Sequence, residues 1–181
     1  MRIVGGRYRN RRVDPPAGMD ARPTTDFAKE GLFNVLTHRV PLEGIRVLDL
    51  FAGTGNVSLE FLSRGAIEVV AVEQDRRLVD FMARTAEAWG EKGLRTQRAD
   101  VFRYLTTARG TFDIVFADPP FAMEGAERIP TLVAEAGLLG DDGLLIVEHP
   151  DRKDMSALPG FRETRRYGQV HFSFFTPPFS P

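Results

Sequence analysis

The feature that most constrains the fold is a regular alternation of apolar strands and helical segments from residue 45 onward. Four segments rich in β-branched and aromatic residues read IRVLDLF (45–51), IEVVAVE (67–73), FDIVFAD (112–118) and GLLIVEH (143–149). Segments with helical spacing separate them, and a weaker strand, LRTQRAD (94–100), precedes VFRYL. This alternation predicts an α/β fold with a doubly wound, mostly parallel sheet. The near-continuous apolar character of the strands indicates that helices cover both faces.

Both ends of the chain depart from this pattern. FRETRRY (161–167) and VHFSFFT (170–176) flank Gly168-Gln169 and predict a C-terminal antiparallel hairpin that closes the sheet. Near the N-terminus, Gly5-Gly6 and Pro15-Pro16 predict a short hairpin or arm, followed by a helix capped by Thr25 or Asp26. The 181 residues are enough for one core. We expect a single domain over 1–181, with a basic arm (1–20) and a main body (21–181).

Composition excludes several classes of protein. The chain has no cysteine, which rules out disulfides, thiolate zinc sites and cysteine nucleophiles. The three histidines show no ligand spacing, so we expect no metal site. No apolar run approaches the ~20 residues of a membrane span, and the N-terminus lacks the apolar stretch of a secretory signal. We therefore expect a cytoplasmic protein without membrane contact.

Charge is unevenly distributed although the formal net charge is only −1. The first acidic residue is Asp14, and five of the first twelve residues are arginine: Arg2, Arg7, Arg9, Arg11 and Arg12. Two interpretations are open. The arginines form either a solvated terminus or a phosphate-binding patch on an otherwise neutral body.

The turn after the first strand, DLFAGTGNVS (49–58), has the composition of a nucleotide-binding loop. Gly53 and Gly55 allow a tight turn and close approach to a ligand, and the following helix directs free N–H groups toward it. Glu73 ends the next strand, where an acid can accept both hydroxyls of a ribose. These features alone suit either a dinucleotide or S-adenosylmethionine. Ser58 replaces the third glycine of a dinucleotide motif, which favours S-adenosylmethionine.

Two further acids have alternative interpretations. Asp49 either faces the cationic amino-acid moiety of the cofactor or orders the loop by accepting backbone N–H groups. Asp100 either contacts the adenine amino group, caps a helix, or does both. The full set expected to contact the cofactor is Asp49, Phe51, Ala52, Gly53, Thr54, Gly55, Glu73, Gln74, Asp100 and Val101.

The fourth strand ends in Asp118-Pro119-Pro120-Phe121. The two prolines have fixed φ angles and no N–H, so the turn presents a carboxylate and carbonyl oxygens in a stiff frame. Such acceptors suit a substrate –NH2 group, and Phe121 can stack on a planar ring. The motif therefore predicts a catalytic clamp that aligns the exocyclic amine of a base for methyl transfer. A rigid strand-to-helix turn without a catalytic role is the alternative.

The two motifs, DLFAGTGNVSLEFLSRGA and FDIVFADPPF, resemble those of class I S-adenosylmethionine-dependent methyltransferases, a Rossmann-like family. MRIVGGRYRNRRV and RPTTDFAKEGLFNVL further resemble the bacterial 16S ribosomal RNA (guanine-N2)-methyltransferases of the RsmD type. The resemblance covers nearly the whole chain. It implies that Asp118 to Phe121 are catalytic, that ribosomal RNA is the partner, and that the N-terminal segments contact RNA or close over the cofactor. We expect the protein to be a monomer. The arginines expected to bind RNA are Arg2, Arg7, Arg9, Arg11, Arg12 and Arg22.

Other functions share parts of this pattern. Methyltransferases acting on adenine N6 or cytosine N4 use the same acid-proline-proline-aromatic motif, but those acting on DNA normally carry a separate recognition domain. A protein-glutamine methyltransferase usually has asparagine at the first motif position. A nicotinamide-dependent oxidoreductase would share the glycine loop but would not need Asp118-Pro119-Pro120-Phe121. A non-catalytic RNA-binding module would explain only the arginines.

Overall fold

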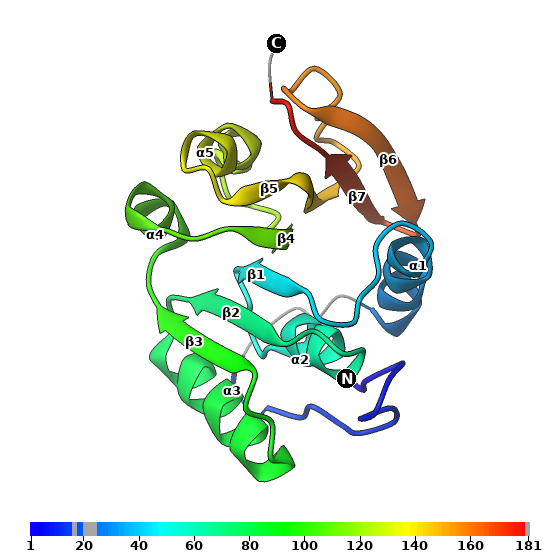
Figure 1. Ribbon diagram of the computed structural model, residues 1–181, viewed down its shortest axis with the longest axis vertical. Helices are drawn as coiled ribbons and strands as arrows, with labels where there is room; N and C mark the ends of the chain where they lie inside the picture. Colours follow the sequence, from blue (N-terminus) through cyan, green and yellow to red (C-terminus); the bar gives the residue numbers. More distant parts are fainter. Residues whose placement is uncertain (16–17, 20–24, 180–181) are drawn as a thin grey trace.

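The computed structural model describes residues 1–15, 18–19 and 25–179 and is built around one seven-stranded sheet (Figure 1). The strands are β1 (Arg46–Leu50), β2 (Glu68–Glu73), β3 (Leu94–Arg98), β4 (Phe112–Ala117), β5 (Leu139–Pro150), β6 (Phe161–Tyr167) and β7 (Val170–Phe175). The helices are α1 (Asp26–Thr37), α2 (Asn56–Ser63), α3 (Arg76–Trp89), α4 (Val101–Thr107) and α5 (Ile129–Glu135), with a short 3-10 turn η1 (Ala126–Arg128) before α5.

The strand order is β3-β2-β1-β4-β5-β7-β6. β1 to β5 pair in parallel, whereas β7 runs antiparallel to both β5 and β6. The predicted doubly wound sheet with a C-terminal hairpin is therefore confirmed. β5 begins at Leu139, before the expected start at Gly143, because a register shift lets Leu139 pair with Phe112 ahead of the regular ladder.

Successive side chains along each strand point to opposite faces of the sheet and form two apolar layers, one on each face. Phe116 and Ile146 pack with residues of α1 and α2, and α3 residues border this layer. Val115 and Leu145 pack with residues of α4 and α5. Figure 1 shows α1 and α2 on one side of the sheet and α4 and α5 on the other. Because the side-chain period of a strand is two, Glu148 projects to the same side as Ile146.

The N-terminal segment folds back along α2 rather than extending into solvent. Arg2 and Arg12 form one antiparallel bridge, which confirms the predicted hairpin in its shortest form. Ile3 and Val13 are fully buried in the layer that contains α1 and α2. The predicted helix cap is also confirmed, since the Thr25 side chain accepts a hydrogen bond from Ala28 N.

No helix among residues 25–179 combines the length and apolar character needed to span a membrane. Within the same described part of the chain, no group of three or more His, Cys, Asp or Glu side chains is arranged to hold a metal ion.

Candidate active site

A cavity of about 480 Å³ lies where the predicted cofactor loop and the Asp118 turn meet. The carboxyl ends of β1, β2, β4 and β5 contribute to it, as expected for ligand sites in open α/β sheets. All four residues of the predicted catalytic motif line the cavity. The predicted cofactor residues that line it are Phe51, Ala52, Gly53, Thr54, Glu73, Gln74, Asp100 and Val101. Asp49 and Gly55 are not among the residues that line it.

The turn between β1 and α2 adopts left-handed backbone conformations. Phe51 has φ 64°, unusual for a residue with a side chain, and its ring meets Phe102 edge-on at 6.4 Å. Gly55 has φ 75°, and a Cβ built there would lie 2.7 Å from Cγ of Met82. Gly55 is thus required by the backbone conformation and by α3 packing. Strain at Phe51, on the order of 1–3 kcal/mol, fits a loop shaped for a ligand.

Glu73 is held by the backbone while it lines the cavity. Its Oε2 accepts a hydrogen bond from Gly53 N at 3.0 Å, and its Oε1 accepts one from Asp75 N at 2.9 Å. A carboxylate has about four lone-pair positions, so ribose hydroxyls can still donate to it. Asp100 caps α4 by accepting from Arg103 N at 2.9 Å, which confirms the predicted cap, and it lines the same cavity.

Asp49 lies beneath the loop and is only 1% exposed. Its carboxyl accepts a hydrogen bond from the Ser58 hydroxyl. The pKa of Asp49 is raised to about 7: burial is the main cause, the hydrogen bonds from Ser58 oppose the shift, and the nearby Glu73 charge adds to it. This environment favours the interpretation in which Asp49 orders the turn from β1 to α2. It also explains why serine occupies the position of the third glycine.

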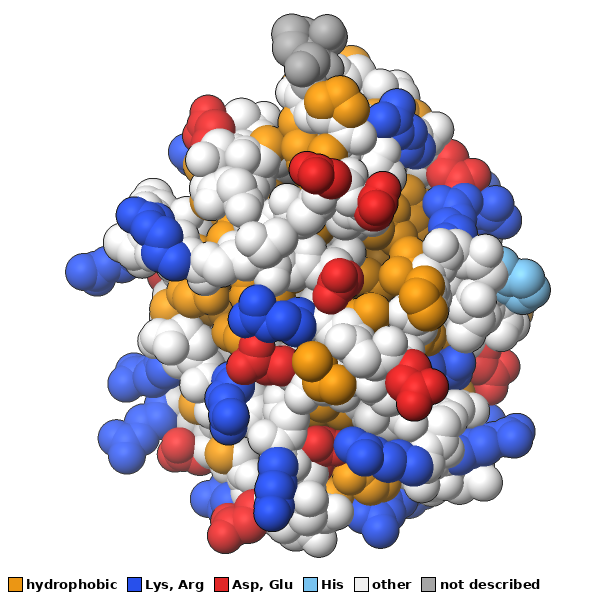
Figure 2. Space-filling model, in the orientation of Figure 1, with side chains coloured by type: hydrophobic (Ala, Val, Ile, Leu, Met, Phe, Trp, Pro, Cys, Tyr) orange, Lys and Arg blue, Asp and Glu red, His pale blue; other side chains and the backbone are white. Residues whose placement is uncertain are grey.

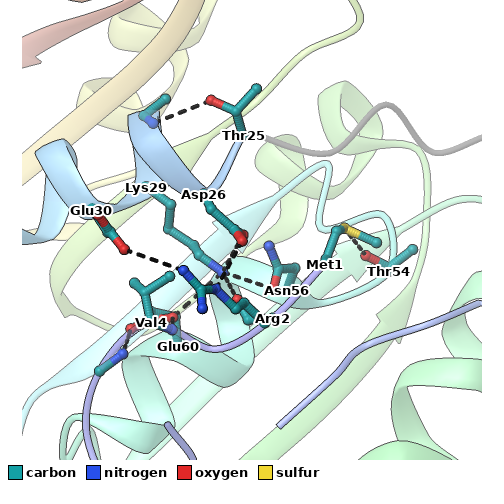
Figure 3. A network of polar contacts seen from close by, with 12 residues as sticks. Met1, Arg2, Val4, Thr25, Asp26, Lys29, Glu30, Thr54, Asn56 and Glu60 are labelled. Carbon is teal, nitrogen blue, oxygen red and sulfur yellow. Dashed lines mark hydrogen bonds and ion pairs between the residues drawn. The ribbon is translucent and has the colours of Figure 1, made fainter. Parts of the chain in front are cut away.

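Asn56 is a candidate cofactor residue that sequence reasoning missed. It lines the cavity at 5% exposure, and its Oδ1 accepts a hydrogen bond from Lys29 Nζ at 3.0 Å (Figure 3). Lys29 can only donate, so this bond fixes which end of the amide is oxygen. Nδ2 is buried with no hydrogen-bond partner among the described residues. An unsatisfied buried donor at a helix N-terminus fits an anionic group such as the cofactor carboxylate.

Lys29, on α1, contacts both the N-terminal segment and α2. Its side chain is fully buried, and Nζ contacts the Arg2 carbonyl oxygen and, at 3.5 Å, Glu60 Oε2 (Figure 3). Glu60 in turn accepts hydrogen bonds from the backbone N–H groups of Val4 and Gly5, both at 2.8 Å. Burial lowers the pKa of Lys29, and the charge of Glu60 opposes that shift. Sequence gives no sign of this network because its members are far apart in the chain.

The Asp118 turn continues the sheet before leaving it. Asp118 N donates to Leu50 O at 3.2 Å, so β1 still pairs with this residue. Pro120 O accepts from Met123 N at 2.8 Å, and Phe121 O accepts from Arg152 Nη2 at 2.6 Å. These bonds brace the turn from behind. The structure thus brings the Asp118 turn and Glu73, the last residue of β2, to one cavity.

Glu148 is a second residue that sequence reasoning missed. It belongs to β5, lines the cavity, and is only 3% exposed. The sequence predicts a strand over 143–149, but nothing in the local pattern distinguishes Glu148 as a functional residue. Its place in the site can be inferred only once β5 is known to lie beside β4.

Most of the arginines predicted to bind RNA have partners within the protein. Arg2 pairs with Asp26, Arg7 with Glu91, and Arg12 with Asp14. Arg11 lies over the rings of Tyr8 and Trp89, at 5.1 and 5.2 Å from their centroids. Arg9 forms no ion pair with any described residue, and Arg22 lies outside the described residues. In Figure 2, basic side chains over the lower half of the view are interspersed with acidic ones.

The strand order, the glycine turn and the acid-proline-proline-aromatic turn together define a Rossmann-like methyltransferase. Residues 1–176 match a protein family described as conserved hypothetical protein 95. The ribosomal RNA small subunit methyltransferase D of Escherichia coli K12 is 31% identical over 178 residues, covering 97% of this chain and 89% of that protein. The chain therefore belongs to the RsmD-type family of small-subunit ribosomal RNA methyltransferases.

Solved structures agree with this assignment. A hypothetical protein from Thermus thermophilus superposes with a TM-score of 0.85 and is 31% identical, covering 97% of this chain and 99% of that one. The 16S rRNA N2 G1207 methyltransferase RsmC of T. thermophilus, in complex with AdoMet and guanosine, superposes with a TM-score of 0.69 at 25% identity. That alignment covers 87% of this chain and 44% of RsmC.

Proposed function

We propose that this protein transfers a methyl group from S-adenosylmethionine to the exocyclic N2 amine of a guanine in small-subunit ribosomal RNA. The observation that carries the proposal is the shared cavity: the Asp118–Phe121 clamp and the Glu73 carboxylate line one space of about 480 Å³. Relatives named as rRNA methyltransferases and the guanosine complex of RsmC support the substrate class.

The lining residues suit the three parts of the cofactor. Glu73 would accept the ribose hydroxyls, Asp100 would accept from the adenine amino group, and Asn56 Nδ2 would donate to the methionine carboxylate. Each is held in place by protein hydrogen bonds, so little reorganisation is needed on binding. The bound cofactor supplies an activated methyl group on a sulfonium sulfur.

The Asp118 turn aligns the nucleophile. The N2 lone pair of guanine is delocalised into the ring, so the amine is weakly nucleophilic. Hydrogen bonds from its two N–H groups to the Asp118 carboxylate and the Pro119 carbonyl hold the nitrogen with its lone pair directed at the methyl carbon. Asp118 would stabilise the positive charge that develops on nitrogen as it takes up the methyl group, while the electron pair of the broken S–C bond stays on sulfur. The amine proton would then pass to the Asp118 carboxylate, to which that N–H donates, and the methylated base is left neutral.

Phe121 gives the base a stacking surface at the entrance. It is partly exposed and lines the cavity beside the clamp. A guanine within a helix cannot bring N2 to this depth, so the target base must be unpaired or flipped out.

The proposal is tested by binding and transfer with one preparation of protein. Calorimetry should detect S-adenosylmethionine and not a nicotinamide dinucleotide. Tritium-labelled methyl groups should then appear in small-subunit RNA from cells that lack this gene, and not in RNA from cells that have it. Selective binding of the nicotinamide dinucleotide, or label in neither RNA, would refute the proposal.

A further inference from the structure

Glu148 lies beside Asp118 on the neighbouring strand. The β4–β5 register pairs Ala117 with Val147, so Asp118 and Glu148 follow as the next residues on adjacent strands. Neighbouring strands are about 4.8 Å apart, and residues at equivalent positions share a face. Both residues line the same cavity, and Glu148 is 3% exposed. Two carboxyl groups from adjacent strands thus line the cavity in which the substrate amine would bind.

The pair is chemically suited to a ligand with adjacent N–H donors. Ionised carboxylates only accept hydrogen bonds, and close carboxylates in a buried site repel each other. A guanine presents N1–H directly beside its N2 amine, so both positions donate. Adenine and cytosine instead carry an unprotonated ring nitrogen next to the exocyclic amine. That nitrogen is a hydrogen-bond acceptor, so it cannot bond to a carboxylate, which is also an acceptor.

We propose that Glu148 is a specificity-determining residue that accepts a hydrogen bond from guanine N1–H while Asp118 holds the N2 amine. This inference rests on the proposed function and adds to it the physical reason for choosing guanine. The acid-proline-proline-aromatic motif alone is common to enzymes acting on any exocyclic amine. The second carboxylate, supplied by β5, makes the site reject bases whose neighbouring ring nitrogen is an acceptor.

The test uses 2-aminopurine, which retains the N2 amine but lacks N1–H. A small-subunit RNA fragment carries either guanine or 2-aminopurine at the methylated position, and kcat/KM is measured for each. The wild-type protein should prefer guanine on the order of a hundredfold or more, because the analogue leaves a buried carboxylate facing an acceptor. In Glu148→Gln the amide can turn its N–H toward that acceptor. The preference should then fall at least about tenfold, with affinity for S-adenosylmethionine unchanged.

Glu135→Gln is the matched control, since Glu135 is exposed at the end of α5. It should leave the preference at the wild-type value. Equal rates for both bases with the wild-type protein would overturn the inference even if Glu148→Gln failed to fold. An unchanged preference in a folded Glu148→Gln variant would also overturn it. Absence of any transfer to guanine N2 by the wild-type protein would instead refute the proposed function itself.

Discussion

Replacing Asn56 with alanine removes one buried donor from the cofactor pocket and little else. Nδ2 has no hydrogen-bond partner among the described residues, so no hydrogen bond from that atom to them is lost. Lys29 loses Oδ1 as an acceptor but keeps the Arg2 carbonyl and Glu60. The free energy of unfolding should therefore fall by about 1 kcal/mol, the typical value of one hydrogen bond.

The effect on cofactor binding should be larger. A hydrogen bond to a charged group contributes about 1.5–3 kcal/mol, so Asn56→Ala should weaken S-adenosylmethionine binding about 10- to 150-fold. The assay is calorimetry with two ligands, S-adenosylmethionine and its decarboxylated form. Because the decarboxylated ligand lacks the group that Asn56 would contact, its Kd should change less than about twofold.

Asn34→Ala controls for loss of an asparagine side chain, since Asn34 is exposed on α1 and does not line the cofactor cavity. It should bind both ligands as the wild type does. Equal weakening of both ligands by Asn56→Ala would show that Asn56 acts through loop structure alone. Unchanged affinity for S-adenosylmethionine in the folded variant would refute the assignment outright.

The remaining predictions concern chemistry, pH and RNA. Asp118→Asn should slow methyl transfer from the saturated complex by roughly a hundredfold, measured in single-turnover assays, with S-adenosylmethionine affinity nearly unchanged. The pKa of Asp49 is about 7 in the folded chain against an ordinary 3.8, so the folded state holds the extra proton. The contribution of Asp49 to stability therefore falls as pH rises from about 4 to 7. Over this range the free energy of unfolding of Asp49→Asn, measured in unfolding titrations, should increase relative to that of the wild type by up to ~1.4 kcal/mol per pH unit. Arg9→Ala should weaken RNA binding and lower its log–log salt slope by about 0.7, whereas an unaltered slope would make Arg9 a solvated side chain.

Sequence reasoning predicted the sheet because the strand signals are local. The β1 to β5 segments are short, apolar and separated by helical spacing, and the Gly168-Gln169 turn marks the final hairpin. The ends of these strands also carry recognisable chemistry, so Glu73, Asp100 and Asp118 could be assigned to one edge of the sheet. The N-terminal extension of β5 was missed because Gly140, Asp141 and Asp142 hide its pairing with β4.

The residues that sequence reasoning missed depend on contacts between distant segments. Asn56 becomes an oriented donor only because Lys29, on another helix, contacts its oxygen. Glu148 becomes part of the site only through the neighbouring position of β4 and β5 in the sheet. The partners of the arm arginines could not be predicted for the same reason. Local charge leaves a solvated terminus and a phosphate-binding patch both open, and only folding brings Arg2 and Arg7 against acids on α1 and near the end of α3. Their binding to RNA stays a prediction.

The central claim is that the Asp118 clamp methylates guanine N2 in small-subunit ribosomal RNA, and nucleoside mapping tests it most directly. RNA from a strain lacking the gene is treated with the protein and S-adenosylmethionine, digested, and analysed by mass spectrometry against nucleoside standards. The account predicts N2-methylguanosine at a single position, absent from the untreated RNA and from RNA treated with Asp118→Asn for the same short time. New N6-methyladenosine or N4-methylcytidine in place of N2-methylguanosine would contradict it.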